Sequence, residues 1–235
     1  MTHQCYNHPA PGVDVKSLTG QLIVIEGSDS SGRSTQIRLL SEWLEQRGYA
    51  VTQTGLSRSR LVGAELEEAK QGNVLSPRTM SLFYASDFYD QLENLIVPSL
   101  RAGYIVLADR YIYTLMARDI VGGANRDWLK SLYSMALVPD AVFFLVVSSP
   151  ALVERTLTTH GTMDYWESGM DLGIARDWYD SFVTYQRRLR AEYTKLQEEY
   201  GFEMINANRS ITAVQKDLRA RIQIVLEHAQ EREGQ

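Results

Sequence analysis

The stretch QLIVIEGSDSSGRSTQ, residues 21–36, decides the architecture of the chain. Residues 21–26 form an apolar run, which predicts a buried strand. Gly27 and Gly32 follow at the spacing G-x-x-x-x-G-[K/R]-S-T, and an amphipathic segment begins directly after them. A glycine-rich turn between a buried strand and a helix is typical of a phosphate-binding loop, because backbone N–H groups and the helix N-terminus attract anions.

Two side chains of this loop carry most of its chemistry. Ser34 occupies the position whose hydroxyl contacts magnesium in such loops, and Arg33 stands where they carry lysine. The chain contains 19 arginines and 5 lysines, so a general preference for arginine offers a neutral explanation for Arg33. The residues expected to bind phosphate are Gly27, Ser28, Asp29, Ser30, Ser31, Gly32, Arg33, Ser34 and Thr35.

A second motif, ADRY at 108–111, closes another apolar run. Asp109 is therefore expected at the carboxyl edge of the sheet, where open α/β folds bind ligands. A carboxylate there can hold magnesium, and Arg110 beside it can bind an anionic oxygen. An Asp-Arg pair at a strand end is equally compatible with a structural role. Together with the loop at 27–35, however, it predicts a phosphate site formed by two separate segments of the chain.

Composition narrows the class of protein. The 235 residues are 44% hydrophobic and 23% charged, which is typical of a globular protein, and no apolar run approaches the roughly 20 residues that span a bilayer. The net charge of −5 argues against binding to nucleic acid polymers. Residues 1–20 have no secretory signal and are expected to form a flexible polar arm. Cys5, the single cysteine, cannot form an internal disulfide, which favours a cytoplasmic location.

Apolar runs alternate with amphipathic segments, which predicts a parallel sheet covered by helices. No repeat or low-complexity linker interrupts the pattern, so we expect one α/β domain at 21–232 with a polar lid at about 160–172. Helices are expected at 33–47, within 57–72, from Pro77 to about Gly103, from about Pro150, and at 178–200 and 210–229. The five expected strands span residues 21–26, 49–54, 104–109, 141–147 and 202–206.

In order and spacing, these blocks resemble the thymidylate kinase family of P-loop nucleoside monophosphate kinases. IEGSDSSGRSTQ is similar to that family's FEGLDGAGKSTQ, LFYASDF to LLFAADR, and GYIVLADRYIYTLMARDIVGG to GEIVLCDRYVDSSLAYQG. The similarity continues through VPDAVFFLVVSSPALVER, YQRRLRAEY and INANRSI, and so covers nearly everything after residue 20. It implies the P-loop NTPase fold, a three-layer sandwich with a five-stranded parallel sheet.

The resemblance also implies a function. An ATP- and Mg²⁺-dependent transferase of nucleotide biosynthesis would pass the γ-phosphate to a nucleoside monophosphate, with dTMP as the default acceptor. It implies that the chain is a homodimer, whereas the composition and charge described above argue against a membrane or nucleic acid partner. ATP would bind the loop at 27–35, and the metal would lie near Ser34 and Asp109. The implied catalytic residues are Arg33, Asp29, Arg110 and Arg155, and the implied acceptor-binding residues are Arg58, Tyr84, Phe88, Arg110, Thr114 and Arg118.

Four positions depart from the family pattern. Arg33 replaces the loop lysine, Phe88 replaces an arginine that reads the base, and Arg118 replaces a tyrosine that packs on the sugar. The lid HGTMDYWE at 160–167 lacks the arginine of the family's RGELDRIE. Since an added arginine can be worth roughly 10³- to 10⁵-fold in phosphoryl transfer, Arg33 is a candidate replacement. Other candidate cations are Arg155, Arg187, Arg188 and Arg190.

Two alternatives remain open on the sequence. One is a phosphotransferase with a different acceptor or donor. A deoxynucleoside kinase would place a catalytic glutamate after the second strand, and residues 52–63 contain no acidic residue. The other is a nucleotide-binding protein that has lost most of its catalysis, which Arg33 and the arginine-poor lid favour.

Overall fold

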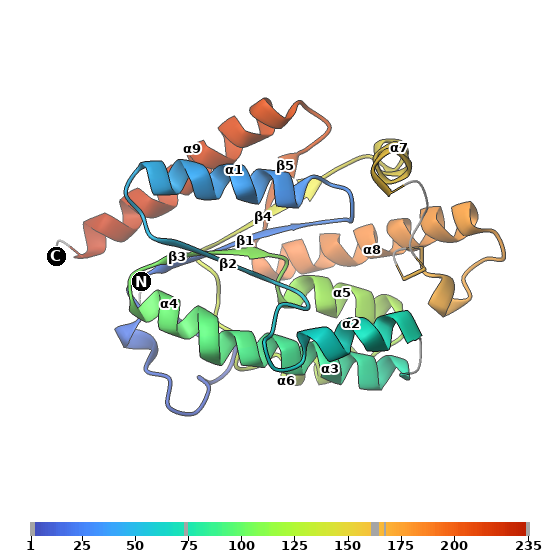
Figure 1. Ribbon diagram of the computed structural model, residues 1–235, viewed down its shortest axis with the longest axis horizontal. Helices are drawn as coiled ribbons and strands as arrows, with labels where there is room; N and C mark the ends of the chain where they lie inside the picture. The colour runs from blue at the N-terminus through green and yellow to red at the C-terminus, as the bar shows by residue number, and fades with distance from the viewer. Residues whose placement is uncertain (1–2, 73–74, 161–164, 167, 234–235) are drawn as a thin grey trace.

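A computed structural model describes residues 3–72, 75–160, 165–166 and 168–233. Within these ranges, five parallel strands form one sheet in the order β2-β3-β1-β4-β5 (Figure 1). The predicted α/β class and its parallel sheet are confirmed, and every predicted strand overlaps an observed one. The strands are β1 (Gln21–Gly27), β2 (Val51–Gly55), β3 (Ile105–Asp109), β4 (Ala141–Val146) and β5 (Glu203–Asn206).

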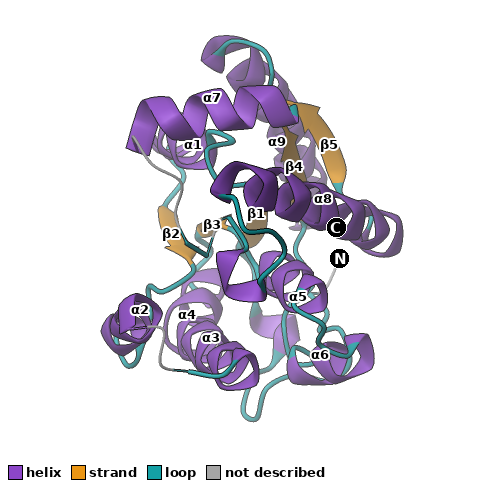
Figure 2. Ribbon diagram, turned by 90° about the vertical axis from the view of Figure 1, so that its right-hand side faces the viewer, coloured by secondary structure: helices purple, strands orange, loops and turns teal. Residues whose placement is uncertain are grey.

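Helices cover both faces of the sheet (Figures 1 and 2). The apolar sides of α1 (Arg33–Gln46) and α9 (Ile211–Glu233) pack on one face through leucines such as Leu40 and Leu218, which are fully buried. The remaining helices, apart from α7, lie toward the other face. They are α2 (Gly63–Gly72), α3 (Pro77–Gln91), α4 (Val97–Arg101), α5 (Ile112–Val121), α6 (Arg126–Leu132) and α8 (Trp178–Tyr200). Helix α7 (Ser149–His160) precedes the lid, and short 3₁₀ turns occur at η1 (Val15–Ser17) and η3 (Met170–Leu172).

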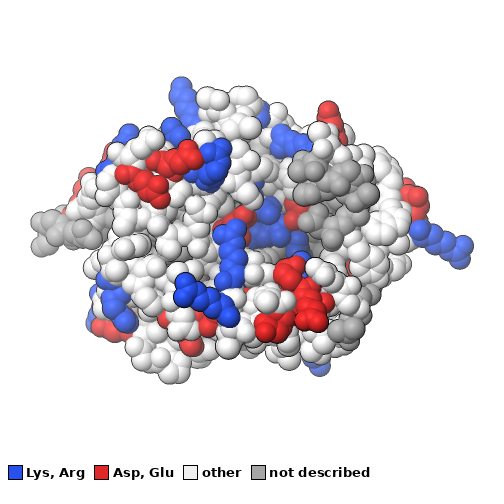
Figure 3. Space-filling model, in the orientation of Figure 1, with Lys and Arg blue, Asp and Glu red and all other residues white. Residues whose placement is uncertain are grey.

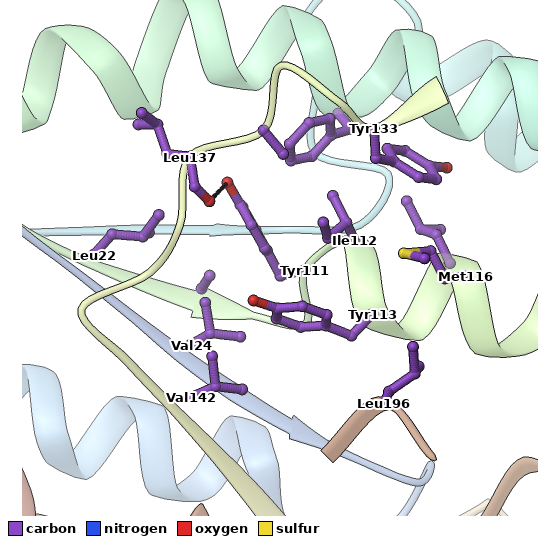
Figure 4. Close-up of a cluster of buried hydrophobic side chains, with 14 of the residues drawn as sticks. Leu22, Val24, Tyr111, Ile112, Tyr113, Met116, Tyr133, Leu137, Val142 and Leu196 are labelled. Atoms are coloured by element: carbon purple, nitrogen blue, oxygen red, sulfur yellow. Dashed lines mark hydrogen bonds between the residues drawn. The ribbon is translucent and has the colours of Figure 1, made fainter. Parts of the chain in front are cut away.

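The core beneath α5 is rich in tyrosine (Figure 4). Tyr111 is almost completely buried, and its hydroxyl donates to the carbonyl oxygen of Leu137 at 3.0 Å. This bond satisfies a polar group that burial would otherwise leave without a partner. The cluster fixes the start of α5, and therefore the direction of the ADRY segment that precedes it.

The long helix predicted from Pro77 to about Gly103 is divided in the structure. Helix α3 ends at Gln91, a π-helical turn, η2 (Leu92–Ile96), follows, and α4 ends at Arg101. Pro98 has no N–H group and cannot bond to the carbonyl four residues earlier. The N–H of Val97 instead reaches the carbonyl of Leu92, five residues earlier, so the wider turn accommodates the proline.

The N-terminal segment differs from the expected flexible arm, because residues 3–20 pack against the domain. His3 is buried, and Cys5 forms an antiparallel bridge with Leu137. The ring of Tyr6 contacts those of Tyr113 and Tyr200 edge-on, and its hydroxyl bonds to the hydroxyl of Tyr113. Polar residues dominate this segment, so its few buried side chains form no hydrophobic periodicity from which packing could have been predicted.

Residues 110–140, for which no element was expected, contain α5 and α6. In the described part of the chain, no helix is both long and apolar enough to cross a membrane. The carboxyl ends of β1, β2 and β3 meet at one edge, where Ile25 and Gly55 both lie opposite Asp109. At this edge a hollow bordered by basic side chains opens between the two helical layers (Figure 3).

Candidate active site

The phosphate-binding loop has the predicted position between β1 and α1. Gly27 has φ +153° and Gly32 has φ +95°, and a side chain at Gly27 would lie 2.8 Å from the Ser31 hydroxyl. Gly32 is also the residue that caps α1, so the turn directs the helix N-terminus into the site. A cavity of about 650 Å³ opens on this loop, lined by Ser30 to Gln36, Arg155, Ala207, Arg209, Ser210, Ile211 and Val214.

Arg33 folds back over the loop instead of extending into solvent. Its Nε donates to Asp109 at 2.8 Å, and its Nη1 donates to the carbonyl oxygens of Gly27 and Ser28, each at 2.5 Å. Its Nη2 also lies 3.9 Å from the Asp29 carboxylate, and the side chain is only 10% exposed. The planar guanidinium therefore contacts the loop and both carboxylates of the site at once, which a lysine ammonium could not do in the same geometry.

The two residues predicted to hold magnesium lie next to each other. The Ser34 hydroxyl donates to Oδ2 of Asp109 at 3.1 Å. A hydroxyl and a carboxylate are the oxygen ligands that Mg²⁺ accepts, with water and phosphate oxygens completing its shell. This donor pair therefore fits the ion. Among the described residues there is no group of three or more His, Cys, Asp or Glu side chains able to hold a metal without a nucleotide.

Asp29 is surrounded by arginines. Arg110 contacts one oxygen of its carboxylate and Arg118 donates to the other at 2.9 Å, while Arg33 is the third cation near it. Arg110 has φ +74°, a left-handed conformation that is uncommon for a residue with a side chain. Strained backbone of this kind often occurs at functional sites, and here it follows directly after Asp109 at the strand end.

Arg58 and Arg155 contact different parts of the site. Arg58 Nη2 is 3.7 Å from Asp109, and the Arg58 side chain is 44% exposed. Arg155, from α7, donates to the carbonyls of Ser31 and Ala207 at 3.3 and 2.9 Å. Its guanidinium therefore joins the loop to the turn after β5. Arg155 is also one of the residues that line the 650 Å³ cavity.

A second, smaller cavity of about 160 Å³ lies under the lid. Tyr84 and Arg118, both predicted to bind the acceptor, line it together with Trp166 from the lid segment. The Trp166 indole N–H donates to the carbonyl oxygen of Lys70 on α2 at 3.1 Å. The volume is below the roughly 300–1,000 Å³ of pockets that enclose whole ligands, so it suits a single flat ring.

Four of the six predicted acceptor residues do not line this cavity. Arg58 and Arg110 lie beside Asp109 and Asp29 instead. Phe88 and Thr114 are buried in the core, which corrects the expectation for these two. Phe88 is 5% exposed and packs edge-on against Tyr89, Tyr111 and Tyr133 in the core. Thr114 is 1% exposed, and its hydroxyl bonds to Glu26 at 2.6 Å and to Tyr193 at 2.8 Å. In both cases the rotation of the helix turns the side chain inward, which motif alignment alone does not reveal.

Two buried acids that the sequence analysis missed support the site. Glu26 accepts from the backbone N–H of Tyr111 at 3.0 Å, and burial raises the pKa of its carboxyl despite these hydrogen bonds. Asp87 accepts from the N–H groups of Ser57 and Ser59 at 2.9 and 2.8 Å and so holds the turn that carries Arg58. An acid ending an apolar strand, as in QLIVIE, is the signal that could have identified Glu26.

The predicted lid falls partly outside the described residues, because 161–164 and 167 lie outside them. Of the arginines on α8, Arg187, Arg188 and Arg190 line neither cavity. Residues 165–166 and 168–172, in contrast, form one wall of the smaller cavity through Trp166, Asp171 and Leu172. The described part of the lid thus contributes an aromatic, an acidic and an aliphatic side chain to this cavity.

Comparison with known proteins gives a consistent result. A family model described as thymidylate kinase matches residues 25–218. The chain is 37% identical over 203 residues to the probable thymidylate kinase 2 of Saccharolobus solfataricus, covering 86% of this chain and 95% of the relative. It is 31% identical over 214 residues to the probable thymidylate kinase of Thermococcus kodakarensis, covering 87% and 98%. The corresponding protein of Pyrococcus abyssi is 28% identical over 208 residues, with 86% and 95% covered.

Proposed function

The chain belongs to the thymidylate kinase family, and we propose that it transfers the γ-phosphoryl group of ATP to the phosphate of dTMP, giving dTDP and ADP. One observation carries this proposal. A series of ion pairs joins the two cavities, from Arg33 in the larger one through Asp29 to Arg118 in the smaller one. A donor phosphate on the loop and an acceptor phosphate beside the smaller cavity would meet along this series.

The donor phosphates would be bound by the loop backbone and the N-terminus of α1. Ser34 and Asp109 would hold Mg²⁺, which when bound neutralises part of the phosphate charge. Arg155 holds the loop against the turn after β5 through its two carbonyl contacts. It therefore acts as a positioning residue for the donor side.

On the acceptor side, Arg58 and Arg110 would bind the monophosphate, because their planar groups can each make two charge-assisted hydrogen bonds to one phosphate. Tyr84 would stack on the pyrimidine ring in the 160 Å³ cavity. Asp29 has the role of holding three arginines at the point between the two phosphates. This positioning matters because phosphoryl transfer depends mainly on alignment and on charge neutralisation.

Arg33 would supply the charge that a lid arginine supplies elsewhere in the family. It is buried against Asp29 and Asp109, so its guanidinium is already held between the two cavities before any nucleotide binds. We further propose a homodimer, which the mass in solution would test. The lone thiol of Cys5 supports a cytoplasmic location.

A coupled assay with ATP, Mg²⁺ and a panel of nucleoside monophosphates tests the proposal. We expect turnover with dTMP and a loss of that turnover when Mg²⁺ is removed by chelation. Turnover with another monophosphate in place of dTMP would reassign the acceptor. Binding of nucleotides without turnover on any acceptor would instead identify a nucleotide-binding protein that has lost catalysis.

A further inference from the structure

The smaller cavity contains a carboxyl group that has no role in the steps above. Asp119, near the end of α5, lines the cavity with Tyr84 and Trp166. Its Oδ2 atom is buried and has no hydrogen-bond partner among the described residues. A buried carboxylate oxygen without a donor is unfavourable, so this atom is set up either to carry a proton or to meet a ligand.

Arg118 is the cation whose charge acts on this carboxyl. Arg118 directs a guanidinium nitrogen to Asp29 at 2.9 Å, on the side of the phosphate loop. On α3, the Ser81 hydroxyl donates to the carbonyl of Pro77 at 3.0 Å, and it also lies close enough to the Asp119 carboxyl to lower its pKa. The hydroxyl of Tyr133 is also buried without a partner among the described residues. Burial and then the charge of Asp119 raise the pKa of Tyr133, so that hydroxyl stays neutral.

Further titratable groups on the cavity wall come from other elements. They are Lys70 on α2, Tyr84 on α3, Asp171 on η3 and Tyr185 on α8. Burial raises the pKa of Asp119 to about 6, although the Ser81 hydroxyl and the Arg118 charge act in the opposite direction. An ordinary aspartate titrates near 3.9, so this carboxyl is partly neutral close to physiological pH.

The two charge states of a carboxyl recognise different partners. A neutral carboxyl carries one O–H donor beside one acceptor oxygen, whereas a carboxylate only accepts. The imide edge of thymine or uracil presents an N–H donor beside a carbonyl acceptor. A neutral carboxyl satisfies both groups, but a carboxylate would place an oxygen against the carbonyl lone pairs.

We propose that Asp119 is the residue that reads the acceptor base, and that it does so as the neutral acid, donating to the ring carbonyl and accepting from the adjacent imide N–H. The inference rests on the proposed function, since it assumes a pyrimidine monophosphate as acceptor. Its consequence is a pH-dependent affinity for the acceptor. The neutral form predominates at low pH, so the contribution of Asp119 to dTMP binding is largest below about pH 6 and falls as the pH rises through the carboxyl pKa.

Calorimetric titration of the full-length protein with dTMP between pH 5.5 and 8.5 tests this inference. Asp119→Asn is the decisive variant, because an amide is a permanently neutral donor and acceptor of the same shape. We expect the dTMP Kd of the wild-type protein to rise relative to that of Asp119→Asn, by up to about tenfold for each pH unit above 6. The dTMP phosphate titrates near pH 6 in both titrations, so the ratio of the two Kd values isolates Asp119.

Two controls accompany this titration. Asp127→Asn, an exposed aspartate on α6, should leave the pH profile of dTMP binding unchanged. Binding of ATP to Asp119→Asn should equal that of the wild-type protein at each pH. Should Asp119→Asn fail to fold, carboxyl NMR of the wild-type protein gives an independent readout. One aspartate should titrate near pH 6, and its pKa should rise on saturation with dTMP.

The outcomes separate the two proposals. A Kd ratio that does not change with pH, or a carboxyl whose pKa falls when dTMP binds, would overturn the role of Asp119 and leave the kinase proposal in place. Absence of dTMP binding by the wild-type protein at every pH would overturn the acceptor assignment and this inference together.

Discussion

At the scale of single residues, the exchange of lysine for arginine at position 33 has a visible structural consequence. Arg33 bonds to Asp109 through Nε and to the loop carbonyls through Nη1, so its head group is fixed by three acceptors. An ammonium group has no planar fork and would lose part of this set. A general bias toward arginine explains the residue type but not this arrangement.

Arg33→Ala should lower kcat by about 10²-fold or more, because it removes a cation aligned with the transferred group. Arg33→Lys should keep the charge but lose the fork, and we expect activity below that of the wild type by up to about tenfold. Arg38→Ala is the matched control, since Arg38 lies on the same helix, is 62% exposed and pairs with Glu42. Steady-state kinetics measure kcat for each variant. A lysine variant with a higher kcat than the wild type would show that the arginine impairs catalysis.

At the scale of elements, the lid and α2 together enclose the acceptor side. The hydrogen bond from Trp166 to the Lys70 carbonyl holds the lid segment on the helix, and Trp166 also packs near the small cluster of Leu66, Ala69 and Met80. A neighbouring turn is fixed in a similar way, because Asp87 on α3 caps the N–H groups around Arg58. Helix α3 thus orients both the turn that carries Arg58 and the ring of Tyr84.

Trp166→Phe keeps an aromatic wall but removes the hydrogen bond to Lys70. A net hydrogen bond is worth about 0.5–1.5 kcal/mol, so the KM for dTMP should rise roughly 2- to 10-fold while the KM for ATP stays constant. Trp43→Phe, on α1 and outside both cavities of the site, serves as the control. Equal changes in both KM values would argue for a general loosening of the fold rather than a local effect on the acceptor.

At the scale of the whole molecule, the N-terminal segment is part of the folded domain. Its Tyr6 ring packs edge-on against the rings of Tyr113 and Tyr200 and so extends the tyrosine-rich core beside α5. Burial raises the pKa of Tyr6 above its usual range, so its hydroxyl is neutral in the folded protein and can share a hydrogen bond with Tyr113. The segment contacts neither of the two cavities that make up the site.

Tyr6→Ala should therefore lower stability without changing catalysis. Loss of a partly buried aromatic ring costs about 2 kcal/mol, which corresponds to a fall in Tm of roughly 4–8 °C for a domain of this size. His8→Ala removes an exposed side chain of the same segment and should leave Tm unchanged. Thermal unfolding followed by circular dichroism measures both variants. A Tm for Tyr6→Ala equal to that of the wild type would mean that the segment contributes nothing to the fold.

Much of the donor side could be predicted because it is encoded locally. An apolar run, two glycines and a helix start lie within residues 21–36, and Asp109 ends its own strand, so the pairing of β1 with β3 brings Ser34 and Asp109 together. The acceptor side was predicted less well. Its residues come from α3, α5 and the lid, and a helix presents a side chain to the core or to a cavity according to its rotation.

The sequence by itself determined the α/β class, the positions of the five strands along the chain and the glycine-rich turn after the first strand, because each depends on short-range patterns of hydrophobicity and glycine. Only the tertiary structure decided that Phe88 and Thr114 belong to the core, that residues 3–20 pack against the domain, and that Asp119 lines the smaller cavity. It also brought Asp29 to Arg118 across 89 positions of sequence. Contacts of this kind depend on how finished elements pack, because burial and charge are set by neighbours that are distant in the chain.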